Sequence, residues 1–155
     1  MSARVILGEA DFDAGAELAR LEALGGGGVA SFTGVVRGGD GLEALRLEIY
    51  PGMTLRALED IVAEAERRWA LLGVTLIHRH GPVPAGGRIV FVGVASRHRR
   101  AALEACAFLI DWAKSRAPFW KQEMFADGRS RWVEARAADE DAAAAWDASA
   151  EHGCP

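Results

Sequence analysis

The chain has 155 residues, of which 50% are hydrophobic and 26% charged, and its formal net charge is −4. This length and composition suit one soluble globular domain with a sizeable core. The negative net charge argues against general nucleic-acid binding. The N-terminal residues lack the apolar run of a signal peptide, and no stretch reaches membrane-spanning length. We therefore expect a cytoplasmic protein with no membrane segment.

Charge is distributed unevenly along the chain. Residues 97–121 contain six Lys or Arg side chains and two acids, whereas residues 134–155 contain six acids and one arginine. A basic patch on an acidic protein suits a small anionic ligand or an acidic partner. The two cysteines are Cys106, in an apolar helical pattern, and Cys154, next to the last residue. They favour neither a structural disulfide nor a metal site.

The N-terminal part of the chain predicts a strand, a helix and a β-hairpin. Residues 4–7 form the strand, and Asp13 caps a helix whose leucines recur every three residues. Residues 29–37 are β-rich, and residues 42–50 alternate apolar and polar side chains. Because a glycine-rich turn separates these two segments, we expect them to pair as a hairpin.

The middle of the chain predicts two helices and two strands. Thr54 can cap a helix whose apolar residues follow a helical period up to Trp69. Residues 74–80 form a strand, residues 81–87 a loop, and residues 88–96 a strand buried on both faces. Ser96 then caps a long helix. Pro118 ends this helix, since proline has no amide hydrogen and disfavours helical geometry in the residue before it.

The C-terminal part predicts a second hairpin and an acidic tail. Residues 119–125 and 131–134 flank Asp127-Gly128, which is a good turn signal. Beyond Arg136 the chain is alanine-rich and acidic, which is typical of either a surface helix or a frayed segment. Because helices and strands do not alternate strictly, the sequence predicts a single α+β domain over residues 1–137, with a tail at 138–155.

The segment from Lys114 to Lys121 contains the strongest candidates for chemistry. Lys114 falls in the last turn of the long helix, where the dipole and free carbonyls favour a cation. Lys121 follows Pro118 on the next strand, so two ammonium groups from two elements can converge. Such lysines can act as a nucleophile or base, or they can stabilise negative charge that develops in acyl transfer. The alternative is an ordinary basic helix end followed by an edge strand.

Four other cationic side chains are candidates for binding an anion. Arg37 ends its strand, and Arg136 follows residues 132–135. His98 and Arg99 lie in the first turn of the long helix, where free backbone amides already favour an anion such as phosphate. Each of these residues could instead be a solvated end of its element.

His98 and Lys114 are too far apart to share one small ligand within a single chain. They are sixteen residues apart on one helix, which corresponds to about 24 Å. If both serve one site, a second copy of the protein must supply one end. Under that condition, the hypothesis is a homodimer with two symmetric sites, each built across the subunit interface.

Two histidines on one predicted strand raise the question of a metal site. His78 and His80 alternate along that strand, but no third ligand has suitable spacing. We expect a structural role for both and no bound metal.

Taken together, these segments resemble the large, catalytic subunit of molybdopterin synthase, the MoaE family. The matching pieces follow the family's order from about residue 4 to residue 137. They are Phe32-Thr33-Gly34-Val35-Val36-Arg37, Leu47-Glu48-Ile49-Tyr50-Pro51-Gly52-Met53-Thr54, Ile77-His78-Arg79, Val90-Phe91-Val92-Gly93-Val94, His98-Arg99, Lys114-Ser115-Arg116-Ala117-Pro118-Phe119-Trp120-Lys121 and Trp132-Val133-Glu134-Ala135-Arg136.

The resemblance implies an α/β-hammerhead-type fold with an additional antiparallel β-sheet, and a homodimer at the centre of a heterotetramer. Each large subunit would receive the C-terminal Gly-Gly tail of a small, ubiquitin-like subunit (MoaD-type) that carries a thiocarboxylate. The implied reaction transfers sulfur from that tail to cyclic pyranopterin monophosphate, twice, and forms the dithiolene of molybdopterin. It implies neither a metal nor another cofactor.

The resemblance also implies roles for individual residues. Lys114 matches the family's essential lysine beside the thiocarboxylate carbon, and Lys121 matches its second active-site lysine. His98 and Arg99 match the pair that holds the pterin phosphate across the dimer. The other substrate-binding positions are Val35, Val36, Arg37, Gln122, Glu123 and Arg136, and the pocket-lining positions are Phe32 and Ile110. Ile49 and Ile110 depart from the residues common in the family, which bears on pocket shape.

Two other interpretations remain open at this point. The chain could be a non-catalytic module that keeps the fold and binds a ubiquitin-like tail or an anionic small molecule, or it could be a structural oligomer. The presence of both Lys114 and Lys121 favours the enzyme, because a degenerate binding module should have lost at least one of them.

Overall fold

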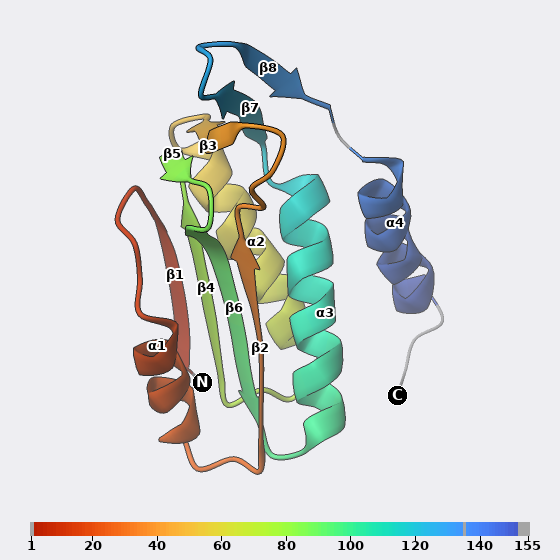
Figure 1. Ribbon diagram of the computed structural model, residues 1–155. Coiled ribbons are helices and arrows are strands. Elements are labelled where there is room, and N and C mark those ends of the chain that lie inside the picture. Colours follow the sequence, from red (N-terminus) through yellow and green to blue (C-terminus); the bar gives the residue numbers. More distant parts are fainter. Residues whose placement is uncertain (1, 135, 152–155) are drawn as a thin grey trace.

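In the computed structural model, the described residues are 2–134 and 136–151, so Cys154 lies outside them. These residues form helices and two β-sheets (Figure 1), which confirms the predicted α+β class with a second antiparallel sheet. In chain order the elements are β1 (Ser2–Gly8), α1 (Ala14–Glu22), β2 (Gly28–Val35), β3 (Leu42–Ile49), α2 (Met53–Arg68), β4 (Gly73–Arg79), β5 (Gly81–Pro84), β6 (Arg88–Ser96), α3 (Arg99–Arg116), β7 (Phe119–Phe125), β8 (Ser130–Val133) and α4 (Ala137–Glu151).

The first sheet has the strand order β1-β4-β6-β2, and only β1 and β4 pair in parallel among its described neighbours. Helices α2 and α3 pack on one face, and α1 packs on the other (Figure 1). Since side chains alternate along a strand, β6 gives Val92 and Val94 to the first face and Phe91 and Ala95 to the second. The prediction that this strand is buried on both faces is confirmed.

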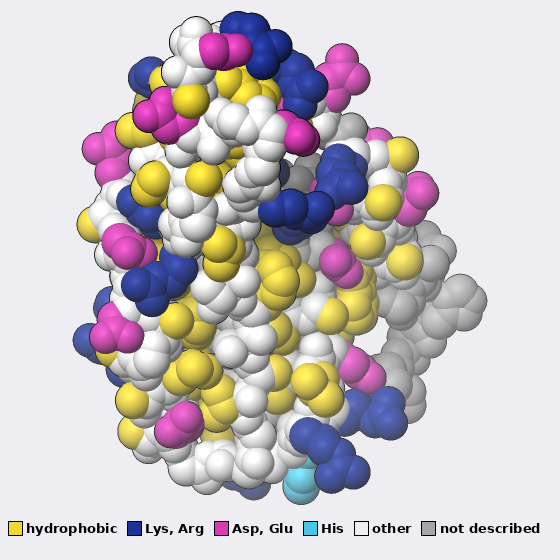
Figure 2. All heavy atoms as spheres, in the orientation of Figure 1, with side chains coloured by type: hydrophobic (Ala, Val, Ile, Leu, Met, Phe, Trp, Pro, Cys, Tyr) yellow, Lys and Arg dark blue, Asp and Glu magenta, His cyan; other side chains and the backbone are white. Residues whose placement is uncertain are grey.

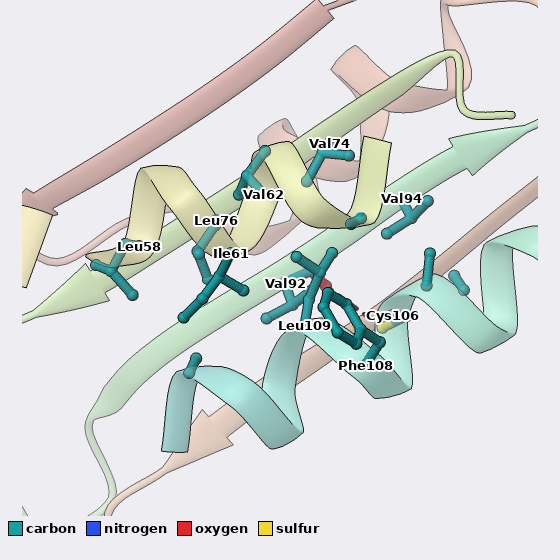
Figure 3. Close-up of a cluster of buried hydrophobic side chains, with 14 of the residues drawn as sticks. Leu58, Ile61, Val62, Val74, Leu76, Val92, Val94, Cys106, Phe108 and Leu109 are labelled. Atoms are coloured by element: carbon teal, nitrogen blue, oxygen red, sulfur yellow. Dashed lines mark hydrogen bonds between the residues drawn. The ribbon is translucent and has the colours of Figure 1, made fainter. Parts of the chain in front are cut away.

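The larger core lies between this sheet and helices α2 and α3. Leu58 and Ile61 on α2 face Phe108 and Leu109 on α3 (Figure 3). The ring of Phe108 is fully buried and contacts Trp112, with ring centroids 4.5 Å apart. This packing holds α3 along the length of the sheet and so fixes the position of its last turn.

The second sheet has the order β5-β3-β7-β8 and is antiparallel throughout. It lies at the end of the first sheet that the C-terminus of α3 reaches (Figure 1). The β7–β8 hairpin predicted around Asp127-Gly128 is confirmed. Val36, Leu47 and Val83 form a small buried cluster between the two sheets, which holds the second sheet in place.

The prediction that residues 29–37 and 42–50 pair as a hairpin is wrong. The first of these strands, β2, pairs with β6, whereas β3 belongs to the second sheet and pairs with β5 and β7. The backbone N–H of Val36 donates to the carbonyl of Gly87 at 2.9 Å, which ties the end of β2 to the loop before β6. Consecutive residues with positive φ, from Gly39 to Gly41, then carry the chain from one sheet to the other.

The predicted loop at 81–87 begins with a strand. Residues Gly81–Pro84 form β5, which pairs with β3 at the edge of the second sheet. Proline is tolerated in an edge strand because the missing amide hydrogen need not face a partner strand. The prolines at 82 and 84 are thus the reason why the sequence predicts a loop where the structure has a strand.

Two helix caps also differ from the prediction. The residue that caps α2 is Gly52, whose φ of 82° glycine adopts without strain, and the residue that caps α3 is His98. Ser96 lies before the helix, and its hydroxyl donates to the carbonyl of Ala70 at 3.1 Å. Thr54 lies inside the first turn of α2 and makes two bonds to other segments.

Helix α4 packs against α3 instead of extending away from the domain (Figure 1). The indole N–H of Trp112 donates to the carbonyl of Ala143 at 3.1 Å, and the indole N–H of Trp146 donates to Asp111 at 2.8 Å. Ala143 is buried between the two helices. Residues 137–151 therefore form a helix, which is one of the two structures that the sequence left open.

We expect Thr54→Val to lower the free energy of unfolding by about 1–3 kcal/mol. The fully buried Thr54 hydroxyl donates to the carbonyl of Pro118 at 2.7 Å and accepts from the backbone N–H of Tyr50 at 3.0 Å. Valine has the same shape but leaves both backbone groups without a partner. Urea denaturation of this variant beside Thr54→Ser, which keeps the hydroxyl, measures the effect; equal stability of Thr54→Val and the parent chain would contradict it.

Candidate active site

A cavity of about 870 Å³ lies where the second sheet meets the C-terminal end of α3. Its walls come from the end of β2 and the residues after it, from the strands β3, β4, β6, β7 and β8, from the last turns of α3 and from the start of α4. A cavity of this size is in the range that accommodates a small-molecule ligand. Elements that are distant in sequence therefore build one concave site.

The structure brings most of the predicted site residues into this cavity. Those that line it are Phe32, Val35, Val36, Arg37, Ile110, Lys114, Lys121, Glu123 and Arg136. Gln122 is not part of the lining, because alternate residues of β7 point to opposite faces of the sheet. His98 and Arg99 lie at the opposite end of α3 (Figure 1).

The two ends of α3 thus present separate groups of cations. Figure 2 shows basic side chains gathered beside the start of α4 and a second basic group at the N-terminal end of α3. Within one chain the structure does not bring His98 and Arg99 to the lysines, as the helix spacing predicts. A ligand bound in the cavity can reach both groups only if another chain supplies the second.

Because α3 ends between them, Lys114 and Lys121 both line the same cavity. Helix α3 ends at Arg116, and Ala117 adopts an extended conformation before Pro118, as the proline predicts. Lys114 therefore lies in the last helical turn, and Lys121 lies on β7 two residues after Phe119. These are the only two lysines in the whole sequence, so both ammonium side chains of the protein serve this cavity.

The environment of Lys121 is unusual for an ammonium group. Burial lowers the pKa of Lys121 below its ordinary value, the charge of Lys114 lowers it further, and Asp139 acts in the opposite direction. A lysine with a lowered pKa exchanges a proton more readily near neutral pH. The cavity therefore holds two lysines, of which Lys121 gives up its proton more readily than an ordinary lysine.

Acidic side chains share the cavity with these cations. Glu123 forms an ion pair with Arg131 across β7 and β8 at 2.6 Å. The remaining acids of the lining are Glu134, Asp139 and Glu140. Sequence reasoning missed Asp139 and Glu140, because nothing in an alanine-rich tail shows that its first turn returns to the site.

His78 also lines the cavity, although the sequence, which offers no third metal ligand at a suitable spacing, predicted only a structural role. His78 continues the face of β4 that carries Val74 and Leu76, so it is a polar side chain at the end of an otherwise apolar strand face. Its ring is buried and stacks on Phe119, with centroids 4.0 Å apart. Burial lowers the pKa of His78 to about 4, and the nearby charges of both lysines act in the same direction.

The described residues offer little support for metal chemistry. Within residues 2–134 and 136–151, no group of three or more His, Cys, Asp or Glu side chains is placed to hold a metal ion. Cys106 is buried in the main core, and burial raises the pKa of its thiol to about 11. In the same part of the chain, no helix is long and apolar enough to cross a membrane.

We expect the pKa of Lys121 to move in opposite directions when its two charged neighbours are neutralised. Lys114→Met removes a like charge and should raise the pKa, whereas Asp139→Asn removes an opposite charge and should lower it. Because the chain has only two lysines, ¹⁵N-lysine labelling and NMR titration resolve each ammonium group. A pKa that neither substitution changes would contradict this arrangement of charges.

Comparisons with known proteins point to one family. The protein family described as MoaE protein matches residues 7–116. The chain is similar to the molybdopterin synthase catalytic subunit of Salmonella typhimurium, with 50% identity over 147 residues that cover 92% of this chain and 97% of the relative.

Solved structures show the same similarity. The molybdopterin biosynthesis MoaE protein from Burkholderia ambifaria superposes with a TM-score of 0.79 at 44% identity, covering 94% of this chain and 98% of that one. A protein–protein complex of subunits 1 and 2 of molybdopterin-converting factor from Helicobacter pylori matches with a TM-score of 0.66 at 26% identity, covering 86% and 91%.

Proposed function

This chain belongs to the MoaE protein family, and we propose that it is the catalytic subunit of a molybdopterin synthase. In this role it transfers sulfur from the C-terminal thiocarboxylate of a small ubiquitin-like subunit to cyclic pyranopterin monophosphate, which forms the dithiolene of molybdopterin. The observation that carries the proposal is that both lysines of the chain line one cavity large enough for a small-molecule substrate.

The transfer of sulfur needs a positively charged side chain near the acyl carbon that carries the sulfur. The thiocarboxylate sulfur forms a bond to a carbon of the pterin in place of an oxygen, which gives a thioester between tail and pterin. Water then cleaves the acyl–sulfur bond, so the sulfur stays on the pterin and the tail leaves as a carboxylate. Negative charge builds on the acyl oxygen during that cleavage. We assign its stabilisation to Lys114, which reaches the cavity from the end of α3. The lowered pKa of Lys121 suits it to move a proton in the same reaction.

The substrate has a pterin and a phosphate, which we assign to different groups of cations. Arg37, Glu123 and Arg136 surround the lysines, and we assign them to the pterin. We assign the phosphate to His98 and Arg99 of a second copy, at the N-terminal end of its α3, where backbone amides favour an anion. The active form is then a homodimer with two shared sites.

The surface beside α3 supports such a dimer. Strand β2 is the last strand of the first sheet, so its outer edge has no partner strand among the described residues. Phe32 on this strand is 38% exposed, and Leu103 on α3 is 60% exposed. Exposed apolar side chains at a sheet edge are typical of protein interfaces.

The small subunit completes the proposed assembly. The Helicobacter pylori relative is a complex of two subunits of molybdopterin-converting factor, which supports a small-subunit partner for this chain. With the homodimer, this partner gives a heterotetramer of two large and two small subunits. A Gly-Gly tail without side chains can enter a narrow cavity and present its thiocarboxylate to Lys114. We further propose a cytoplasmic location, which suits a phosphorylated substrate that does not cross membranes freely.

A reconstitution assay tests the proposed function. We expect the purified chain, mixed with thiocarboxylated small subunit and cyclic pyranopterin monophosphate, to produce molybdopterin. A parallel binding measurement with the small subunit distinguishes an enzyme from a module that binds the small subunit without reaction. Binding without product would contradict the enzyme and favour a module that only holds the ubiquitin-like tail.

A further inference from the structure

The tautomer of His78 follows from its surroundings. The Nδ1 atom lies 2.8 Å from the carbonyl oxygen of Arg79. Because a carbonyl oxygen can only accept a hydrogen bond, Nδ1 carries the proton, and the neutral ring then has its lone pair on Nε2. Stacking on Phe119 fixes the plane of the ring. His78 is therefore a rigid, neutral hydrogen-bond acceptor in the wall of the cavity.

The two ammonium groups are the positive charges that act on His78 and share its cavity. Phe119 and Lys121 are two residues apart on β7, so their side chains point to the same face of the sheet. His78 stacks on the first of them, so its ring lies against the part of β7 that also carries the second. The charges of Lys121 and Lys114 both act on His78, with that of Lys121 the larger.

We propose that His78 is a positioning residue for Lys121, and that its Nε2 accepts a hydrogen bond from the Lys121 ammonium group. Such a bond fixes the direction in which a flexible side chain points. A carboxylate in this place would also fix the lysine, but it would cancel the charge that an anionic substrate needs. A neutral imidazole orients the ammonium group and leaves its charge in the cavity. The role of the oriented lysine in the reaction rests on the proposed function.

A matched pair of substitutions separates the two nitrogens of the ring. His78→Gln places an acceptor near the position of Nε2 and loses the Nδ1 donor, whereas His78→Asn keeps a donor near Nδ1 and loses the acceptor. We expect His78→Gln to retain kcat within a few fold and His78→Asn to lose about ten- to a hundredfold, with little change in KM. If His78 only anchors the backbone at Arg79, the order of the two variants reverses.

The pKa of Lys121, measured with ¹⁵N-lysine labelling and without any substrate, gives a second readout. A hydrogen bond to the ammonium group favours its charged form, so His78→Asn should lower this pKa and His78→Gln should not. Besides Lys114 and Asp139, the charged side chains that line the cavity are Arg37, Glu123, Arg131, Glu134, Arg136 and Glu140. All of them are unchanged in both variants, so a difference between the variants reports on His78.

The possible outcomes are distinct. Equal behaviour of the two variants, or loss of activity in His78→Gln alone, would overturn the proposal. If the parent chain makes no product, the proposed function fails, and the pKa of Lys121 still decides the role of His78. If the variants do not fold, ¹⁵N-histidine NMR of the parent chain decides it, because a proton on Nε2 or a charged ring at neutral pH would overturn the proposal.

Discussion

Lys114→Ala is expected to lower kcat by roughly 10²- to 10³-fold while the fold stays intact. The side chain is exposed at the end of α3 and points into the cavity, so its removal leaves no void in the core. What it removes is the positive charge closest, in our assignment, to the acyl oxygen during cleavage of the acyl–sulfur bond. Molybdopterin formation under saturating small subunit measures the effect.

Arg116→Ala provides a matched control for this substitution. Arg116 is two residues further along the same helical end, but it pairs with Asp147 and is not among the residues that line the cavity. Its removal takes away one cation from the same end of α3 without touching the site. Loss of activity in both variants would indicate a general effect of charge, and full activity of Lys114→Ala would transfer the catalytic role to Lys121 or the cavity arginines.

Two inactive variants are expected to restore activity when they share one dimer. Lys114→Ala damages the cavity of its own chain, and His98→Ala damages the phosphate site that its chain offers to the partner. In a mixed dimer, one site combines both defects and the other has neither. We therefore expect about half of the parent activity from isolated mixed dimers, against almost none from either variant alone.

A second mixed dimer serves as the control. Lys114→Ala and Lys121→Ala both damage the cavity end, so each chain of their mixed dimer contains one defective cavity. No activity should return in this case. Co-expression with two different affinity tags isolates both mixed dimers. If the first pair assembles and stays inactive, His98 does not serve the partner's cavity.

Local features of the sequence were sufficient for much of the fold. Pro118 predicts where α3 ends, and the continuous apolar run in β6 predicts a strand that is buried on both faces. These predictions hold because a missing amide hydrogen and the alternation of side chains act over a few residues. The pairing of β2 and β3 was wrong because it depends on distant contacts, such as the bond between Val36 and Gly87.

The site was predictable where helix geometry fixes distances. The separation of His98 from Lys114 follows from the length of one helix, and the structure places them at opposite ends of α3. Asp139 could not be predicted, since α4 has no strong amphipathic pattern to show which way it packs. The position of His78 was missed for a different reason, because a histidine that continues an apolar strand face is indistinguishable in sequence from a structural one.

The most direct test of the account follows the sulfur atom itself. A small subunit whose terminal thiocarboxylate carries ³⁴S is mixed with the chain and cyclic pyranopterin monophosphate, and mass spectrometry examines both products. We predict that the label moves into molybdopterin and that the small subunit's tail becomes a carboxylate, with both changes nearly absent in Lys114→Ala. Recovery of the label in a thiocarboxylate that remains intact, or its release as free sulfide without labelled product, would contradict the account.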